Sequence, residues 1–136
     1  MQNRESKRAA ICGVSFIALS ESTVTNVPGV SQIKVSGIWD KMKFSSVDFS
    51  EQLSSDGTNY EVNLTISFSD SSQENQREIM AWIGIYILVR LDYTDGNSRV
   101  VGTDQFPVVL SLSGDGSPHS LRVTYKGQQP ESSKFL

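Results

Sequence analysis

The stretch IGIYILVRLDYTDGNSRVVGTDQF, residues Ile83–Phe106, decides the fold that this chain can adopt. Apolar side chains occupy every second position of its first half, which is typical of a β-strand with one face in a core. The positions between them are also apolar at first, so we expect that half to be covered on both faces. Asp95-Gly96 predicts a hairpin turn, because these residue types tolerate positive backbone φ angles. The apolar side chains at every second position are Ile83, Ile85, Ile87, Val89, Leu91 and Tyr93. The positions between them hold the apolar Tyr86 and Leu88, followed by the polar Arg90 and Asp92.

The composition favours many short strands over a helical bundle. The chain has 136 residues, enough for one domain with a hydrophobic core. Only 38% of them are hydrophobic, and Ser, Thr, Asn, Gly and Asp separate the apolar runs as turns do. We predict one all-β domain over residues 1–136, a β-sandwich or barrel-like arrangement of antiparallel hairpins. One short helix is expected near residues 71–81, an N-terminal arm at 1–9 and a C-terminal tail at 127–136.

Alternating patterns predict further strands before and after the central hairpin. Tyr60–Phe68 is the clearest, with large apolar side chains facing a core and polar ones facing water, and it should pair with Phe44–Leu53. Good helix formers between residues 69 and 82 predict the short helix, with Trp82 in the core at its end. Pro107 indicates a bend or a sheet edge. Another hairpin is then expected from residues 108–112 and 121–126, and a strand is expected at Val30–Trp39. Glu21–Gly29 is interpreted as a connection, and Asp40–Lys43 is left unassigned.

The N-terminal region permits two interpretations. Met1–Arg8 is polar and basic and Ala9–Leu19 is mostly apolar, a layout that imitates a secretory signal peptide. The alternation from Cys12 to Ala18 instead predicts a first strand, which we favour, with a signal peptide as the open alternative. Cys12 is the single cysteine, so an internal disulfide is excluded. Because free cysteines are usually buried, we expect Cys12 to pack in the core.

Residues that carry catalytic or metal chemistry are sparse. His119 is the only histidine, and no motif marks a partner nucleophile. The Asp-Gly pairs fit hairpin tips better than calcium or phosphate loops. Four carboxylates could in principle form a glycosidase pair, but the sequence does not bring any two together. We therefore predict no enzyme activity, no catalytic residue, no cofactor, no metal site and no small-molecule substrate. These carboxylates are Asp48, Glu51, Glu61 and Asp92.

The two ends of the chain suggest a role in assembly. The N-terminal arm is basic, and the tail Gly127–Leu136 lacks periodicity and ends in an apolar pair. We expect such ends to become ordered on a neighbouring copy or partner, by adding to a sheet edge or filling a groove. A net charge of −3 predicts no nucleic-acid partner, and no membrane partner is expected. The candidate interface residues are Arg4, Lys7, Arg8, Phe106, Phe135 and Leu136.

The C-terminal third of the chain resembles a known group of proteins. The run ILVRLDYTDGNSRVVGTDQFPVVL, residues 87–110, is followed by a hairpin and a closing GQQPESSKFL. This resembles short β-rich virion proteins of tailed bacteriophages of gut bacteria, crAss-like phages among them. In that group a strand enters an Asp-Gly turn, continues as V-x-G-x-x-x-x-P and ends near G-x-Q-P. Here these positions are Asp95-Gly96, Val100–Pro107 and Gly127–Pro130.

The resemblance implies a non-enzymatic structural subunit of the tail or head–tail region, such as a ring or connector component. Its partners would be copies of itself and other virion proteins, and it would reside in the virion after assembly in the host cytoplasm. It transfers no catalytic residue. The alternative is a secreted or cell-surface β-sandwich that binds carbohydrate or a host protein. That function would use exposed aromatic side chains such as Trp39, Tyr86 or Phe106.

Overall fold

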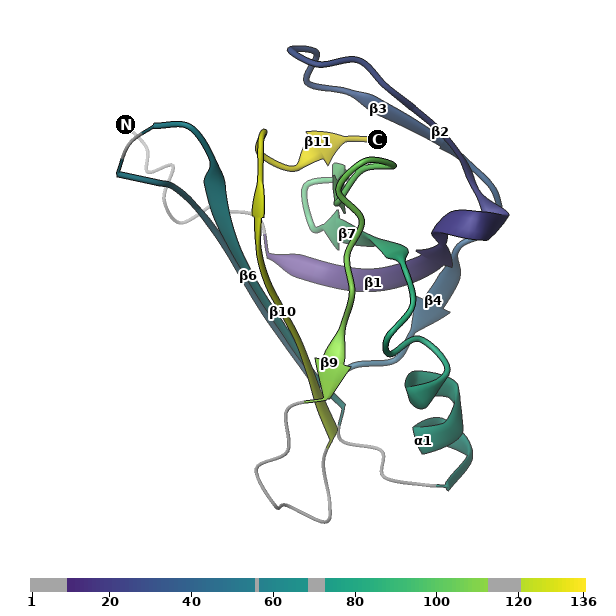
Figure 1. Ribbon diagram of the computed structural model, residues 1–136. Coiled ribbons are helices and arrows are strands. Elements are labelled where there is room, and N and C mark those ends of the chain that lie inside the picture. Colours follow the sequence, from purple (N-terminus) through teal and green to yellow (C-terminus); the bar gives the residue numbers. More distant parts are fainter. Residues whose placement is uncertain (1–9, 56, 69–72, 113–120) are drawn as a thin grey trace.

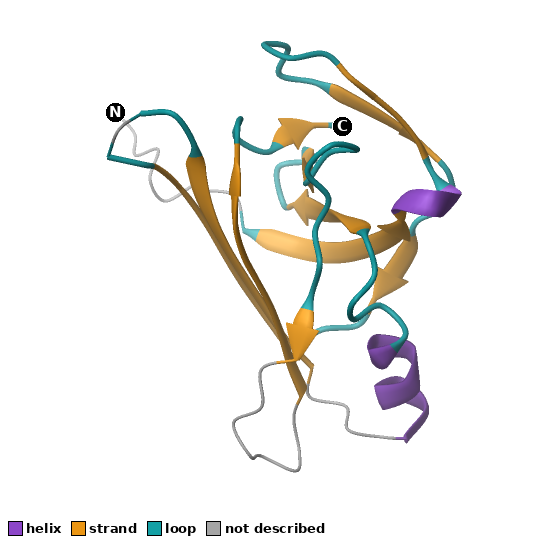
Figure 2. Ribbon diagram, in the orientation of Figure 1, coloured by secondary structure: helices purple, strands orange, loops and turns teal. Residues whose placement is uncertain are grey.

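Three antiparallel sheets build the protein, as shown by a computed structural model that describes residues 10–55, 57–68, 73–112 and 121–136 (Figures 1 and 2). A five-stranded sheet has the order β11-β8-β7-β1-β4, a four-stranded sheet has the order β5-β6-β10-β9, and β2 and β3 form a ribbon. The all-β prediction is confirmed. The strands are β1 (Ile11–Ala18), β2 (Thr23–Asn26), β3 (Ile33–Ser36), β4 (Asp40–Met42), β5 (Ser46–Leu53), β6 (Tyr60–Phe68), β7 (Ile87–Tyr93), β8 (Ser98–Val101), β9 (Ser111–Leu112), β10 (Leu121–Gln129) and β11 (Lys134–Phe135). The helical elements are a 3-10 turn, η2 (Leu19–Glu21), and α1 (Gln73–Met80), which lies within the predicted helical range.

Strand β7 is the centre of the five-stranded sheet, and both of its faces are buried. Its successive residues Leu88 and Val89 are fully buried but belong to two different apolar clusters. The neighbouring strand repeats this alternation, since Phe16 pairs with Val89 and Ile17 pairs with Leu88. The prediction that both faces of this strand are covered is therefore confirmed, and so is the hairpin, in which Gly96 adopts a φ of 92°.

The four-stranded sheet covers one face of β7 and its neighbours. Strand β6 contributes alternate buried side chains, of which Leu64 and Ile66 are at most 1% exposed. It pairs with β10 along its whole length and with β5 over residues 60–67, and the predicted hairpin of β5 with β6 is confirmed. The predicted pairing of residues 108–112 with 121–126 is found only in part, because β9 (Ser111 and Leu112) pairs with β10 whereas Val108 and Leu110 form bridges with Ile87 and Ile83. The turn of this hairpin lies outside the described residues. The larger cluster fills the space between the two sheets.

The β2–β3 ribbon covers the opposite face of the five-stranded sheet (Figure 1). The smaller cluster consists of Ile17, Ile33, Leu88 and Val100, with partly buried side chains of the ribbon packed against it. The interpretation of Glu21–Gly29 as a mere connection is wrong, because Thr23–Asn26 pairs with Ile33–Ser36. The single strand expected at Val30–Trp39 is correspondingly reduced to Ile33–Ser36, and Asp40–Met42 forms a separate edge strand. The ribbon is needed because the second face of β7 is as apolar as the first.

The strand predicted from Ile83 begins only at Ile87. Gly84 adopts a φ of 83° and its N–H donates to the carbonyl of Leu110, which turns the chain before β7 starts. As a result, Ile85 and Tyr86 lie at the surface, 42% and 63% exposed. Trp82, at the end of α1, packs against the larger cluster and meets Phe16 edge to face, with ring centroids 5.7 Å apart.

Cys12 is exposed, which contradicts the expectation of a core cysteine. The pairing of β1 with β7 shifts register between Ile11 and Gly13. Cys12 is therefore the extra residue of a β-bulge, where the alternation of inward and outward side chains is interrupted.

The two-sided burial of β7 predicts a sharp contrast in stability between a substitution in the strand and one just before it. Leu88→Ala should lower the free energy of unfolding by about 2–5 kcal/mol, because it opens a cavity in the smaller cluster. The matched control Tyr86→Ala, two residues away and exposed, should change it by less than about 0.5 kcal/mol. Urea denaturation followed by circular dichroism measures both values. Equal losses for the two variants would contradict the ribbon as a true core layer.

Candidate functional site

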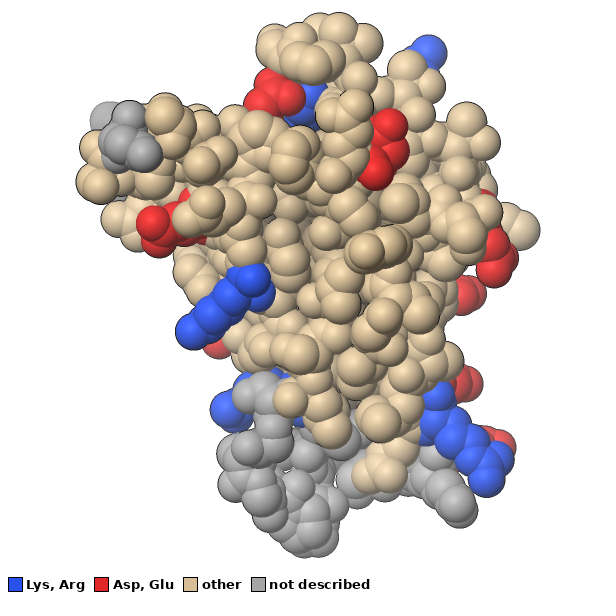
Figure 3. All heavy atoms as spheres, in the orientation of Figure 1, with Lys and Arg blue, Asp and Glu red and all other residues tan. Residues whose placement is uncertain are grey.

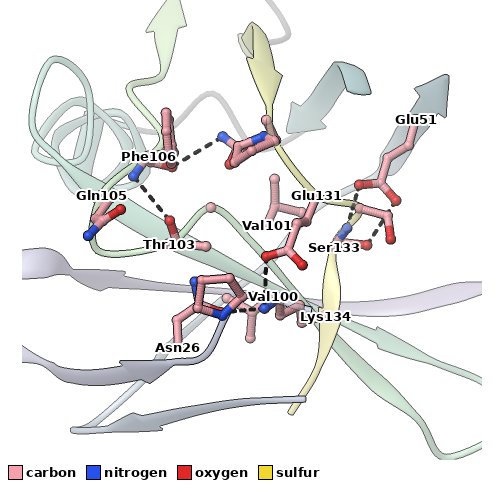
Figure 4. Close-up of a pocket in the computed structure, with 15 residues that line it drawn as sticks. Asn26, Glu51, Val100, Val101, Thr103, Gln105, Phe106, Glu131, Ser133 and Lys134 are labelled. Atoms are coloured by element: carbon pink, nitrogen blue, oxygen red, sulfur yellow. Dashed lines mark hydrogen bonds and ion pairs between the residues drawn. The ribbon is translucent and has the colours of Figure 1, made fainter. Parts of the chain in front are cut away.

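A cavity of about 280 Å³ lies where the C-terminal segment passes over β8 (Figure 4). Its floor is apolar, from the end of β8, and its walls come from the loop after β8 and from the residues between β10 and β11. We call it the C-terminal cavity. The residues that matter for its chemistry are Asn26, Glu51, Phe106, Gln129, Glu131 and Lys134.

Lys134 is the most unusual residue of this cavity, because it is only 4% exposed. Its Nζ donates to Asn26 Oδ1 at 2.6 Å and to the Val27 carbonyl at 2.9 Å, and it lies 3.0 Å from Glu131 Oε1. An ammonium group has three donors, so these three acceptors satisfy it fully. Lys134 is therefore a structural cation that fastens the C-terminal strand to the ribbon.

Glu131 completes this arrangement from the cavity rim. Its Oε2 accepts a 2.7 Å hydrogen bond from the backbone N–H of Gly29, and its Oε1 is paired with Lys134. The Gly29 hydrogen bond, together with the hydrogen bond and charge of Lys134, lowers the pKa of Glu131 below its ordinary value of 4.5. The ionised carboxylate is thus the form that the folded protein favours.

Glu51 connects the C-terminal segment to the other layer of the protein. Its two carboxylate oxygens accept hydrogen bonds from the backbone N–H of Ser133 at 2.6 Å and from the Ser133 hydroxyl at 3.0 Å. Arg99 lies 3.9 Å from Glu51 and stacks over the Phe135 ring at 4.6 Å from its centroid. Residues 133–135 are in this way bonded to β5, to β8 and to the ribbon.

Gln129 is the other buried polar side chain in the cavity wall. Its amide nitrogen donates to the carbonyl of Phe106 at 3.1 Å and to Tyr125 Oη at 2.8 Å. These bonds hold the loop after β8 against β10. Like Lys134 and Glu51, Gln129 is occupied with fixing the backbone. The polar groups of the C-terminal cavity therefore support the fold.

The expectation that Gly127–Leu136 forms a loose tail is wrong. Gly127–Gln129 continue β10, and β11 pairs with β8 in the same molecule. The Phe135 N–H also donates to the Ser31 carbonyl, and the Leu136 N–H donates to the Ser98 carbonyl. Alternation did not reveal this segment, since its strand is two residues long and its inward side chain is a lysine.

The three candidate interface residues that the structure describes do not form one surface. Phe106 is 43% exposed at the C-terminal cavity, whereas Phe135 and Leu136 border a separate hollow beside the β7–β8 turn. Arg4, Lys7 and Arg8 lie outside the described residues. His119 does as well. Of the four carboxylates considered from the sequence, Glu51 is engaged by Ser133, and Asp92 is bound by Arg90 and Ser98 in a different cluster.

A second concavity, of about 730 Å³, lies between α1 and β4. We call it the α1–β4 groove and define it by Glu21, Ile38, Asp40, Glu78, Trp82 and Ile85. Ile38 is 88% exposed and Ile85 is 42% exposed, so the groove presents apolar side chains to solvent beside carboxylates. The sequence did not indicate it, because Ile38 and Ile85 were both assigned to the interiors of predicted strands.

Charged side chains are scattered over the face shown in Figure 3, with acidic groups along the margin that carries η2, β4 and α1. Among the described residues, no three His, Cys, Asp or Glu side chains lie close enough together to hold a metal ion. No helix of the described part of the chain is long and apolar enough to cross a membrane. Comparison of the chain with protein-family models, curated proteins and solved structures finds no match.

The Glu131–Lys134 pair predicts a pH-dependent stability. Folding lowers the pKa of Glu131. The stabilisation that the ionised carboxylate gives to the folded state is therefore complete above about pH 4.5 and is lost as the pH falls through the folded-state pKa. Glu131→Gln should therefore lower the unfolding free energy by about 1 kcal/mol at pH 7, since the carboxylate is one-third exposed and water screens its charge, and by progressively less below pH 4.5. Urea titrations at several pH values measure this.

The matched control is Glu61→Gln on β6, which is exposed and should change stability little. A loss for Glu131→Gln that stays the same from pH 7 to pH 3 would contradict the ionic role of this carboxylate.

Proposed function

We propose that the protein is a non-enzymatic structural subunit of a tailed-bacteriophage virion, in the tail or the head–tail region. It would act through contacts with copies of itself and with other virion proteins. The phage assignment is supported by the resemblance of the C-terminal third, from the Asp95-Gly96 turn to the Gly127–Pro130 segment. The assembly role is supported by the surface of the folded chain.

The observation that carries the assembly role is the exposure of apolar side chains around the α1–β4 groove. Ile38 is 88% exposed, and Ile85, which lines the same groove, is 42% exposed. Single exposed apolar residues are ordinary in soluble proteins, but a concave group of them beside charged residues is typical of protein–protein contact sites. A neighbouring subunit would remove this apolar area from water.

Two sheet edges to which no further described strand is paired offer a second kind of contact. Strand β5 has eight residues and is the last strand of the four-stranded sheet, and β4 is the last strand of the five-stranded sheet. An edge strand presents backbone N–H and C=O groups that another chain can pair with. A ring of subunits related by rotation could satisfy such edges through head-to-tail contacts.

The C-terminal segment has a different role in this proposal from the one expected from the sequence. It is bonded within its own protomer through Lys134, Ser133 and Phe135, so it stiffens the subunit and does not clasp a neighbour. The contacts of the assembly are therefore assigned to the α1–β4 groove and the sheet edges.

The mass of the untagged protein in solution tests the proposal. Size-exclusion chromatography with light scattering should give a defined multimer, and Ile38→Asp should shift it toward the monomer while leaving the circular dichroism spectrum unchanged. The control Val30→Asp replaces an exposed apolar residue of the ribbon turn and should keep the multimer. A monomer up to millimolar concentration would overturn the proposal and favour the secreted binding module. Mass spectrometry of purified phage particles should detect peptides of this chain.

A further inference from the structure

We infer that the α1–β4 groove is the docking site for residues 1–9 of a second copy of this chain. This inference rests on the proposed function, because it names the contact through which subunits would join. The groove, the charges on both sides and the position of Ala10 support it independently.

The groove is preformed, since the backbone that carries Ile38 is tightly constrained. Gly37 adopts a φ of 146°, and a Cβ added there would lie 2.6 Å from Ile17 Cδ1 and 2.9 Å from the Glu21 carbonyl. Only glycine fits at this position without strain. Ile38 is consequently held outward, 88% exposed, opposite the α1 side of the groove.

The charges of the groove and of residues 1–9 are complementary. The groove has three carboxylates, Glu21, Asp40 and Glu78, and one ammonium, Lys41, which gives a net charge of −2. Residues 1–9 contain three basic side chains, Arg4, Lys7 and Arg8, and one acidic one, Glu5, which gives a net charge of +2. Complementary charges of this kind select a partner and fix its register.

The type of basic residue also suits an apolar groove with an acidic rim. Lys and Arg side chains have long aliphatic stems that lie on apolar surface while their charged ends remain in contact with water or a carboxylate. Here the stems would cover Ile38, Ile85 and Trp82, and the charged ends would reach Asp40 and Glu78. A neutral apolar segment would cover the apolar side chains of the groove but would leave its carboxylates without a charged partner.

The position of Ala10 favours a groove on another molecule. Ala10 exchanges hydrogen bonds with Thr94 at the start of β1, whereas Ile17 and Ala18, at the end of β1, border the groove. The eight residues of β1 span about 25 Å, and nine extended residues reach at most about 30 Å. Both edges of β1 are already paired, with β7 and β4. To reach the groove of its own molecule, the chain before Ala10 would have to run back along β1, and nearly all of residues 1–9 would be used to cover that distance.

Photocrosslinking in the full-length protein tests the inference directly. A benzophenone amino acid replaces Ser6, and isotopically heavy and light copies are mixed before irradiation. We expect crosslinks to peptides that contain Ile38 or Glu78, including pairs of one heavy and one light chain. Crosslinks to the groove within single copies only, or crosslinks only to other surfaces, would overturn the inference.

Charge reversal gives a second readout of the same contact. Glu78→Lys should weaken self-association by at least about tenfold, and adding Arg8→Glu should restore it in part. The control Glu74→Lys lies on the same helix outside the groove and should change association by less than about twofold. A multimer insensitive to Glu78→Lys overturns the inference but leaves the proposed function standing. A chain that is monomeric without any substitution overturns both.

Discussion

The burial of both faces of the central sheet is the constraint on which the rest of the structure depends. Leu88 and Val89 are adjacent, fully buried and directed into different clusters, and Val100 and Val101 repeat this on β8. A sheet that is apolar on both faces needs a layer on each side. The four-stranded sheet supplies one layer, and the small β2–β3 ribbon supplies the other. The ribbon must then be held in place, and the C-terminal segment holds it through Lys134, Glu131 and the Phe135 N–H.

The same segment explains why a lysine and a glutamine are buried near the surface of a small β protein. Lys134 has three acceptors and Gln129 has two, so their burial leaves no donor of either group without a partner. Glu51, on the four-stranded sheet, binds the same C-terminal segment by accepting two hydrogen bonds from Ser133. The last residues of the chain therefore join all three layers. Under the proposed function, a protomer whose layers are joined in this way would suit assembly by fixed contacts.

The alternation of apolar and polar residues predicted the strands whose position depends on apolar burial. It failed where a glycine turn or polar hydrogen bonds determine the course of the chain. Tyr60–Phe68 and Ile87–Tyr93 are strands as expected, because a shift of one residue would expose a whole row of apolar side chains. Ile83 and Ile85 follow the same pattern but lie before the strand, since Gly84 turns the chain there. The strand at Lys134 has no hydrophobic signal, and its three acceptors come from residues that are close only after folding. The α1–β4 groove was missed for the same reason, because it combines side chains from four separate segments.

Hydrogen exchange of backbone amides tests the central claim most directly. If the sheet is buried between two layers, the amides of Leu88, Val89 and Leu91 should exchange only through global unfolding, with a free energy equal to that from urea denaturation. The amides of the ribbon, Thr23–Asn26, should exchange through smaller openings. Protection in β7 that is weaker than in β6, or equal to that in the ribbon, would contradict the account.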